Sequence, residues 1–450
     1  MDRELPVRVA LRHQSEPLQL LGDRVERAPL VIRRRRWRGD AFERREDLTL
    51  VRQTDHPSRG YRPERVLRLY DTRRRAIHPV RAPGRAVTMY VCGVTPYDTT
   101  HLGHARTFLT FDLLARILEA TGHPVRYVQN VTDIDESILQ RAARDNVGWR
   151  ELGKREERAY LADMKRLRWR RPDVICHATQ ELPAMFTLVR ALERRGAAYT
   201  LPRGVYFPVA AQPRYGELSG LSAAAMKRIL VGQDDAKLED PGRRDPRDFA
   251  LWRFVDDGPT WPSPWGRGRP GWHLECSSMI RHHLGDQIDI HGGGADLIYP
   301  HHENEIAQSE TASRKRPFSR TWAHVGAMRL GGKKMSKSDG NMVFVRDALN
   351  VTDPRALRLY LLDRHYRKPF DHDEASLDRA RLRAAALGDA LGRGRSGAVG
   401  RAGPAREALS ALEDDLNVVR ALKIVEWAAP RAEAAERAEL RTVARIVGVI

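Results

Sequence analysis

The pattern of apolar and polar positions predicts a strand, a tight turn and a helix between residues 87 and 119. Val87–Val91 is a short, mostly apolar run, which is typical of a buried strand. Gly93, Pro96 and Asp98 follow it, and these residue types interrupt strands and form turns. Along Ala105–Glu119, apolar residues recur at a spacing of three or four, which predicts a helix.

The same periods predict elements along most of the chain. Strands are expected at 125–131, 204–207 and 287–291, and helices at 150–167, 182–195, 300–311, 356–366 and 373–391. Asp133 and Asp135 follow the first of these strands and suit either magnesium binding or helix capping. The segment 392–404 is rich in glycine and arginine and reads as a linker. An apolar stripe that is expected to pack into the core follows at Leu409, Leu412, Leu416, Val419 and Leu422.

A first chemical motif, His101-Leu-Gly-His104, opens the predicted helix. Free N–H groups and the positive end of the helix dipole attract phosphate at such a position. Gly103 lets a flat ligand approach the backbone, and both histidines can donate hydrogen bonds to phosphate oxygens. Taken alone, the tetrapeptide suits a metal-binding histidine pair or two surface histidines equally well.

A second motif, Lys334-Met-Ser-Lys-Ser338, follows two glycines and predicts a loop whose lysines close over a triphosphate; alone, it also suits a solvated loop. Together the two motifs resemble those of the class I aminoacyl-tRNA synthetases. The resemblance implies a Rossmann-like α/β fold with a parallel sheet, and ATP with Mg²⁺ as cofactor. It places the triphosphate between both histidines and Lys337, and the ribose at Asp296. The nucleotide-binding residues implied are His101, Gly103, His104, Gly293, Asp296, Lys334 and Lys337.

Three cysteines at positions 92, 176 and 276 do not make a disulfide framework, and they suit a reducing cytoplasm. Cys92 ends the first strand, and Cys276 lies far along the chain. His301 and Glu305 stand four residues apart on a predicted helix and therefore share a face. Two thiolates, an imidazole and a carboxylate form a reasonable tetrahedral zinc set. The alternative is that the cysteines are small buried hydrophobic residues.

Four segments resemble cysteinyl-tRNA synthetase, and the similarity extends over about residues 66–450: 89–93, 271–276, 289–294 and 300–308. The resemblance implies that zinc is held by Cys92, Cys276, His301 and Glu305. It also implies that the amino-acid pocket is lined by Thr132, Trp272 and His291. Zinc prefers a soft thiolate to a hydroxyl, so it separates cysteine from serine where size discriminates poorly. The implied reaction is the activation of L-cysteine to cysteinyl-adenylate and its transfer to tRNA(Cys).

A related enzyme, the mycothiol cysteine ligase, passes cysteine to glucosaminyl-inositol instead. Residues 92–98 and 241–246 resemble that ligase, as does a C-terminus without a terminal anticodon module. Glu305 and His291 resemble the synthetase, and the tRNA acceptor is therefore preferred. A plain nucleotidylyltransferase would not need the zinc set. A non-enzymatic RNA-binding paralogue should have lost His104, Lys337 or a zinc ligand, and all are present.

The composition adds a formal net charge of +19 and a pI of about 10.2, which favours nucleic-acid contact, although arginine-rich coding gives the same excess. No apolar run is long enough to span a membrane, and the N-terminus lacks a signal-peptide core. A cytoplasmic monomer is therefore expected. The predicted domains are a basic extension of unknown role at 1–65, a catalytic domain at 66–345 with an insertion at about 146–265, and a helical domain at 346–450.

Overall fold

The computed structural model describes residues 66–82, 85–98, 100–230, 240, 242–335 and 340–450. All of them belong to one of two compact units, Pro63–Ile450. The predicted extension at 1–65 lies outside the described residues, as does Lys337. The predicted domain boundaries stay predictions.

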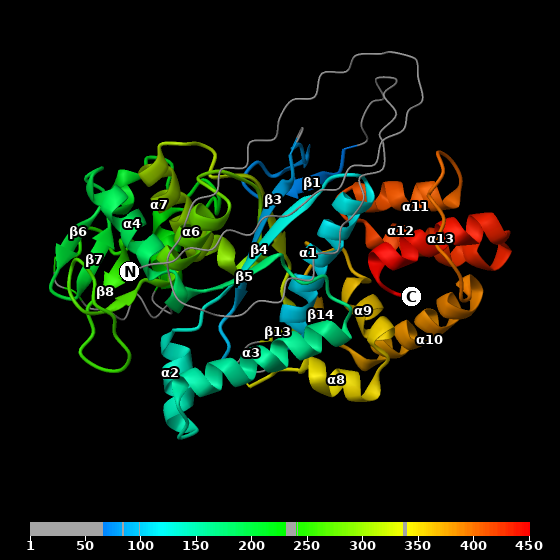
Figure 1. The fold of residues 1–450 in the computed structure, drawn as a ribbon, viewed down its shortest axis with the longest axis horizontal. Coiled ribbons are helices and arrows are strands. Elements are labelled where there is room, and N and C mark those ends of the chain that lie inside the picture. The colour runs from blue at the N-terminus through cyan, green and yellow to red at the C-terminus, as the bar shows by residue number, and fades with distance from the viewer. Residues whose placement is uncertain (1–65, 83–84, 99, 231–239, 241, 336–339) are drawn as a thin grey trace, which may run out of the picture. The chain divides into compact units, whose positions relative to one another are not determined.

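A five-stranded parallel sheet forms the centre of this unit, in the order β11-β10-β3-β4-β5 (Figure 1). Its strands are β3 (Val87–Val94), β4 (Val125–Val131), β5 (Val174–His177), β10 (Ile288–Gly294) and β11 (Ser319–Val325). The chain continues from β3 to β4 on one side, whereas β10 pairs on the other side of β3. The strand order therefore reverses between β3 and β10, and ligands of such sheets bind at this point, beyond the carboxyl ends of the strands. The predicted Rossmann-like α/β fold is confirmed.

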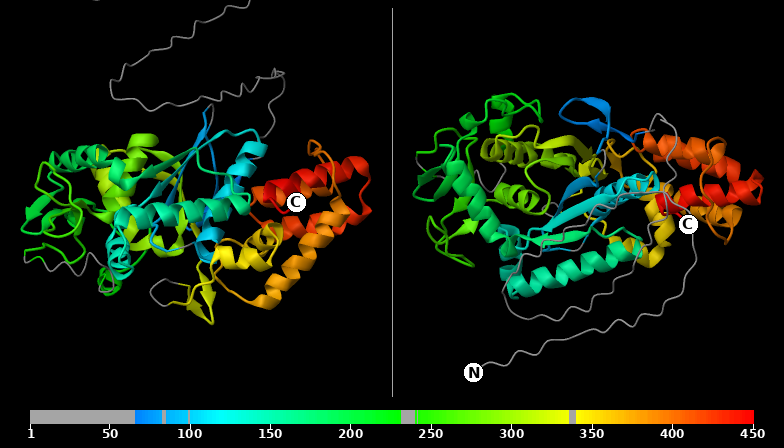
Figure 2. Two further views of the ribbon diagram at one scale, coloured as in Figure 1. Left: turned by 60° about the horizontal axis from the view of Figure 1, so that its bottom comes forward. Right: turned by 45° about the horizontal axis from the view of Figure 1, so that its top comes forward.

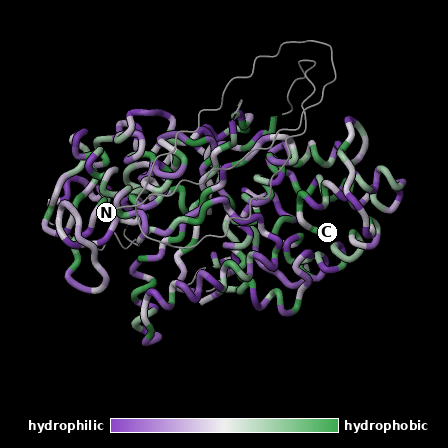
Figure 3. Tube along the Cα trace, in the orientation of Figure 1, coloured by the Kyte–Doolittle hydropathy of each residue, from purple (hydrophilic) through white to green (hydrophobic). Residues whose placement is uncertain are grey.

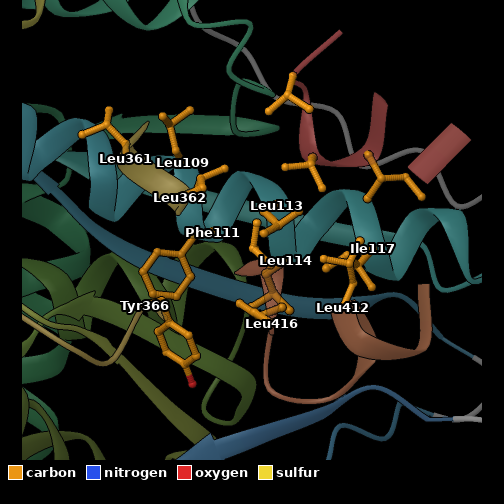
Figure 4. Close-up of a cluster of buried hydrophobic side chains, with 14 of the residues drawn as sticks. Leu109, Phe111, Leu113, Leu114, Ile117, Leu361, Leu362, Tyr366, Leu412 and Leu416 are labelled. Carbon is orange, nitrogen blue, oxygen red and sulfur yellow. The ribbon is translucent and has the colours of Figure 1, made fainter. Parts of the chain in front are cut away.

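Both faces of the sheet are buried, as is usual for a parallel sheet. Side chains of β3 alternate between two cores: Val87, Met89 and Val91 enter one, and Tyr90 and Cys92 enter the other. The first core contains the apolar face of α1 (Leu102–Ala120), α9 (Pro354–Leu362) and α11 (Pro404–Glu413), drawn in Figure 4. The second contains α4 (Leu182–Glu193), α6 (Trp272–His283) and α7 (Glu303–Ser313).

The C-terminal helices pack against α1 through an internal ion pair. The remaining helices of this region are α8 (Val345–Val351), α10 (Glu374–Leu391), α12 (Val418–Ala428) and α13 (Ala434–Val447). Arg358 of α9 is fully buried and pairs with Asp112 of α1, while its guanidinium also donates to the carbonyls of Val447 and Leu167. Polar and apolar positions alternate along these helices, as expected of amphipathic segments (Figure 3).

Smaller elements complete the unit (Figure 2). An antiparallel sheet contains β6 (Tyr199–Leu201), β7 (Gly204–Phe207), β8 (Phe249–Arg253) and β9 (Arg269–Pro270). β1 (Arg68–Asp71) pairs with β2 (Ala76–Pro79), and a third sheet contains β12 (Met328–Leu330), β13 (Lys333–Lys334) and β14 (Phe370–Asp371). The helices α2 (Glu136–Arg144), α3 (Trp149–Arg166) and α5 (Ala223–Leu230) lie between these strands in sequence.

Two predictions near the sheet were wrong at their boundaries. The strand expected at 287–291 continues through Gly294, because its parallel pairing with β11 continues to that residue. Gly292 must lack a side chain there, since a Cβ would lie 2.2 Å from the ring of Phe111. The helix expected at 300–311 begins only at Glu303, because Tyr299 is extended and residues 298–302 form a wider turn.

One prediction in the C-terminal region also needs correction. The helix expected at 356–366 starts two residues earlier, because Asp353 caps it and Pro354 occupies its first turn, and it ends at Leu362. The apolar stripe from 409 to 422 packs into the first core as predicted, at Leu409, Leu412, Leu416 and Leu422. It is interrupted between α11 and α12, where Asp415 and Leu416 have positive φ, and Val419 is only partly buried.

Candidate active site

The first motif forms the N-terminal turn of α1, at the carboxyl end of β3. His101 is the N-cap of the helix, and its Nδ1 accepts a hydrogen bond from the Gly103 N–H at 3.1 Å. The His104 ring stacks on the His101 ring with centroids 3.9 Å apart. A Cβ on Gly103 would lie 2.9 Å from His101 Cε1, so only glycine leaves room for this ring. Two imidazoles therefore lie together at the positive end of a 19-residue helix.

The first motif lies beside the segment that follows the second motif in sequence. The Leu102 N–H donates to the Val343 carbonyl at 2.9 Å, and His101 forms an isolated bridge with Phe344. Lys334 precedes the undescribed residues 336–339, and its Nζ lies 2.8 Å from Asp296 Oδ2. Asp296 lies two residues beyond β10, and both of these side chains are about half exposed. Gly293 lies within β10, and a Cβ there would be a tight 3.0 Å from His302 Cε1 and Leu297 Cδ1.

A buried cluster brings together the four residues that the sequence proposes as metal ligands: Cys92, Cys276, His301 and Glu305. The two sulfurs are 3.8 Å apart, and Cys92 Sγ is 3.6 Å from Glu305 Oε1. His301 Nε2 lies 2.8 Å from the same carboxylate oxygen. No described cysteine is in a disulfide.

These separations fit a tetrahedral zinc ion. With Zn–S near 2.3 Å and Zn–O near 2.1 Å, tetrahedral edges are about 3.8 Å between sulfurs and about 3.6 Å between sulfur and oxygen. The observed 3.8 and 3.6 Å agree with both edges. The pair His301–Glu305, at 2.8 Å, is closer than a tetrahedral edge and has the length of a hydrogen bond.

Four further histidines lie around the cluster among the described residues, and sequence reasoning gave three of them, His273, His302 and His324, no role. His302 Nε2 is 3.3 Å from Cys92 Sγ, and its Nδ1 is 2.8 Å from His324 Nε2. His291 Nε2 is 2.5 Å from Glu305 Oε2. Cys92, His291, His302 and Glu305 therefore make a second, overlapping donor group. The consecutive histidines at 301 and 302 were the available signal for it.

The electrostatics of the cluster favour a charged state at Cys276 and Glu305. Burial raises the pKa of the Cys276 thiol, but the hydrogen bond with Cys92 and the charge of His301 outweigh it and lower the pKa to about 6. Burial also opposes charge on Glu305, yet the charges of His291 and His301 hold its pKa well below the ordinary value. For Cys92, burial and the neighbouring Cys276 raise the pKa well above that of a free thiol. Two of the proposed ligands, Cys276 and Glu305, therefore favour the anionic state that binds a metal cation.

Two of the residues proposed for the amino acid contact this cluster. The Trp272 ring packs on the His301 ring with centroids 4.3 Å apart. His291 stacks on Trp322 at 4.5 Å and contacts Glu305 as described above. Thr132 is buried just beyond the end of β4, where its Oγ1 accepts a hydrogen bond from Asn130 at 3.1 Å, and its place in an amino-acid pocket stays a prediction.

The other residues discussed from the sequence have structural roles. Asp135 caps α2 by accepting from the Ser137 N–H at 2.8 Å, so its capping alternative is the one observed. Asp133 accepts from the backbone N–H and the hydroxyl of Thr179. Cys176 is buried, with its sulfur 3.2 Å from Met279 Sδ. Among the described residues, every helix is too short or too polar to cross a bilayer.

Comparisons with known proteins agree with this geometry. Residues 79–382 match the family described as tRNA synthetases class I (C) catalytic domain. The L-cysteine:1D-myo-inositol 2-amino-2-deoxy-alpha-D-glucopyranoside ligase of Nocardia farcinica is 46% identical over 373 residues, covering 80% of this chain and 88% of its own length. The cysteine–tRNA ligase of Gloeothece citriformis is 46% identical over 319 residues, covering 70% of this chain and 65% of its own length. The Mycobacterium tuberculosis methionyl-tRNA synthetase in complex with methionyl-adenylate shares the fold, with a TM-score of 0.57, 17% identity, and coverage of 81% of this chain and 89% of that one.

Proposed function

The chain belongs to the class I (C) tRNA synthetase catalytic family, and from this premise we propose that it activates L-cysteine with ATP and transfers it to tRNA(Cys). One observation carries the first half of the proposal. A buried donor set of two thiols, an imidazole and a carboxylate lies beyond the same strand end, β3, as the two stacked histidines at the start of α1. A thiol-selective centre and a phosphate-binding turn are the two parts that cysteine activation needs.

Cys92, Cys276, His301 and Glu305 would hold the zinc ion. Zinc in that position supplies a soft Lewis acid that binds the substrate sulfur as a thiolate and disfavours the hydroxyl of serine. His291 fixes the orientation of the Glu305 carboxylate through its 2.5 Å contact. Trp272 packs on the buried His301 ring and would help to keep water away from the substrate sulfur. The burial of all four ligands keeps this selection in a dry, low-dielectric place.

On the nucleotide side, His101 and His104 would donate to the phosphate oxygens as the cysteine carboxylate attacks the α-phosphate. The dipole of α1 stabilises the same negative charge. Asp296 would accept the ribose hydroxyls, which frees Lys334 from its present ion pair to turn toward the phosphates. Lys337 would close over the pyrophosphate, and Mg²⁺ is expected with the nucleotide.

The net charge of +19 supports tRNA as the acceptor, since a polyanion needs a basic partner. A second acceptor, glucosaminyl-inositol, is favoured by a specific observation. Two relatives named as the amino-sugar ligase align with 80–81% of this chain and are themselves covered to 88–90%. Two named as cysteine–tRNA ligase align with 65–70% of it and are covered to only 60–65%.

The test separates the two half-reactions. Cysteine-dependent exchange of pyrophosphate into ATP is expected, with serine far weaker. Equal exchange with serine, or no exchange with cysteine, would refute the activation step. The purified protein is then given cysteine, ATP and either tRNA or glucosaminyl-inositol. Charged tRNA supports the first acceptor, whereas a cysteinylated amino sugar with uncharged tRNA establishes the second.

A further inference from the structure

A third group of metal-ligating side chains lies apart from the buried cluster. It consists of Glu181, His282 and His283, whose donor atoms all lie within 4.8 Å of one another. Glu181 Oε2 is 2.6 Å from His282 Nδ1, and Glu181 Oε1 is 2.8 Å from His283 Nε2. Each carboxylate oxygen therefore faces one imidazole. None of the roles proposed above uses these three residues.

The group joins the ends of two neighbouring helices. Glu181 is the N-cap of α4, but its side chain makes no capping hydrogen bond there. The two histidines are the last residues of α6, and both helices pack into the second core (Figure 1). The C-terminal end of a helix attracts a cation, and the Glu181 carboxylate offsets the positive end of α4. The two helix ends therefore suit a cation held between them.

The carboxylate of this group is enclosed, whereas one of its partners is open to solvent. The Glu181 side chain is 10% exposed, compared with 19% for His283 and 57% for His282. A buried carboxylate is unfavourable unless opposite charge or hydrogen bonds compensate it. Among the described residues, Glu181 forms ion-pair contacts with these two histidines alone, and neutral rings leave its charge unbalanced. A bound cation would balance that charge, and it could enter past the exposed His282 ring.

The three donor atoms select a class of metal. Imidazole suits zinc, copper and nickel, whereas magnesium and calcium prefer oxygen ligands. Two imidazoles and one carboxylate leave one tetrahedral position, which water would fill on the exposed side. With Zn–N and Zn–O near 2.1 Å, the tetrahedral edge between nitrogen and oxygen is about 3.4 Å. The two short contacts would therefore lengthen by less than about 1 Å around an ion, a change that the exposed His282 side chain permits.

We propose that Glu181, His282 and His283 form a second, peripheral metal site that binds zinc. This site goes beyond the proposed function and does not depend on it. Cys276 precedes His283 by seven residues, which is roughly 10 Å along α6, so the two sites share a helix but no ligand. The peripheral site has no thiolate and one protein ligand fewer, so it should bind zinc at least about 100-fold more weakly than the buried cluster. A bound ion would tie the C-terminal end of α6 to α4.

Calorimetric titration of the full chain without an affinity tag tests the proposal. The protein is first given one equivalent of zinc, which the buried cluster takes, and further zinc should then bind as one additional ion per chain. His282→Ala and Glu181→Gln should each weaken this second event at least about tenfold. His177→Ala is the matched control, because His177 contacts Glu157 at 3.0 Å in a pair with a single histidine, and it should leave the event unchanged. Circular dichroism checks the fold of each variant.

Cobalt distinguishes the two sites by absorption. The first equivalent should produce the charge-transfer band of a thiolate-bound ion, and the second should add no such band because its ligands contain no sulfur. A second event of normal affinity in both His282→Ala and Glu181→Gln would overturn the proposal, as would an equal loss in His177→Ala or no second event in the unmodified protein. Absence of the thiolate band, with the second event intact, would instead refute the zinc set of the proposed function and leave the peripheral site standing.

Discussion

Two overlapping groups of side chains could hold the metal, and they share only two members. Both contain Cys92 and Glu305, but one adds Cys276 and His301 and the other adds His291 and His302. We predict that Cys276→Ser weakens zinc binding much more than His302→Gln does. The geometry favours the first group, because its two sulfurs are 3.8 Å apart, which matches the tetrahedral edge for two zinc-bound thiolates.

The size of each effect follows from the role of the side chain. A complete four-ligand zinc site contributes roughly 10–16 kcal/mol, so one direct ligand is worth about 3 kcal/mol, or a factor of roughly 150 in affinity. His302 touches Cys92 from outside this tetrahedron and is itself held by His324 at 2.8 Å. Loss of such an outer partner changes metal affinity by about 10–100-fold. Cys276→Ser should therefore reduce the affinity for zinc more than His302→Gln does.

Competition with a chromophoric chelator measures both affinities, and circular dichroism confirms that each variant is folded. Substitution of cobalt for zinc gives a second measurement. The thiolate-to-cobalt charge-transfer absorption should be weakened in Cys276→Ser and retained in His302→Gln. The opposite order, with Cys276→Ser binding zinc normally and His302→Gln losing it, would place the metal in the second group and refute the ligand set proposed above.

Three more outcomes follow from the described contacts and from the motif around Lys337. Gly103→Ala should raise helix stability, because alanine is a better helix former than glycine by up to about 1 kcal/mol. The new Cβ would lie 2.9 Å from the His101 ring and push the ring away, so pyrophosphate exchange should slow roughly tenfold. An unchanged exchange rate would contradict this prediction. Lys337→Ala should slow single-turnover adenylate formation and leave the cysteine Kd unaltered, and a raised Kd at normal rate would count against its role. Burial opposes charge on Asp415, but His365, the Tyr70 N–H and Arg367 outweigh it and hold its pKa below the usual value. Its contribution to the free energy of unfolding is therefore complete above about pH 4 and lost as the pH falls further, so Asp415→Asn should flatten the acid limb of a stability–pH curve, and parallel curves would refute it.

Sequence reasoning succeeded where a local pattern decides the structure. The strand at 87–91 is a mostly apolar run, the strand at 125–131 contains three valines and a tyrosine, and both form. It failed where contacts between residues far apart in the sequence determine the structure. The strand expected at 287–291 stops before Gly292–Gly294, but pairing with β11, and with β3 at Gly292, extends β10 through them. Arg358 and Asp112 are 246 residues apart, and nothing local marks either of them as half of a buried ion pair.

The candidate site was likewise predictable where its residues belong to local sequence motifs, and not where the path of the chain brings them together. The four proposed ligands belong to recognisable motifs, and the fold brings them together. The role of His302 was not predictable, because it depends on how the chain bends at Tyr299 before α7. A regular helix through Pro300 would have turned one of the two consecutive histidines away. The wider turn instead buries both, and thereby creates the overlap between the two donor groups.

One strand fixes how the metal cluster and the nucleotide turn are related. Because side chains alternate along β3, Cys92 faces α6 and its Cys276, while Val91 faces α1. A slip of one residue in register would send Cys92 to the α1 face. Parallel pairing of β3 with β4 and β10 on both sides prevents that slip. The same strand leads into the turn at His101, so backbone geometry sets the span between the proposed thiolate and phosphate sites. Such preorganisation would serve the first half-reaction whatever the acceptor.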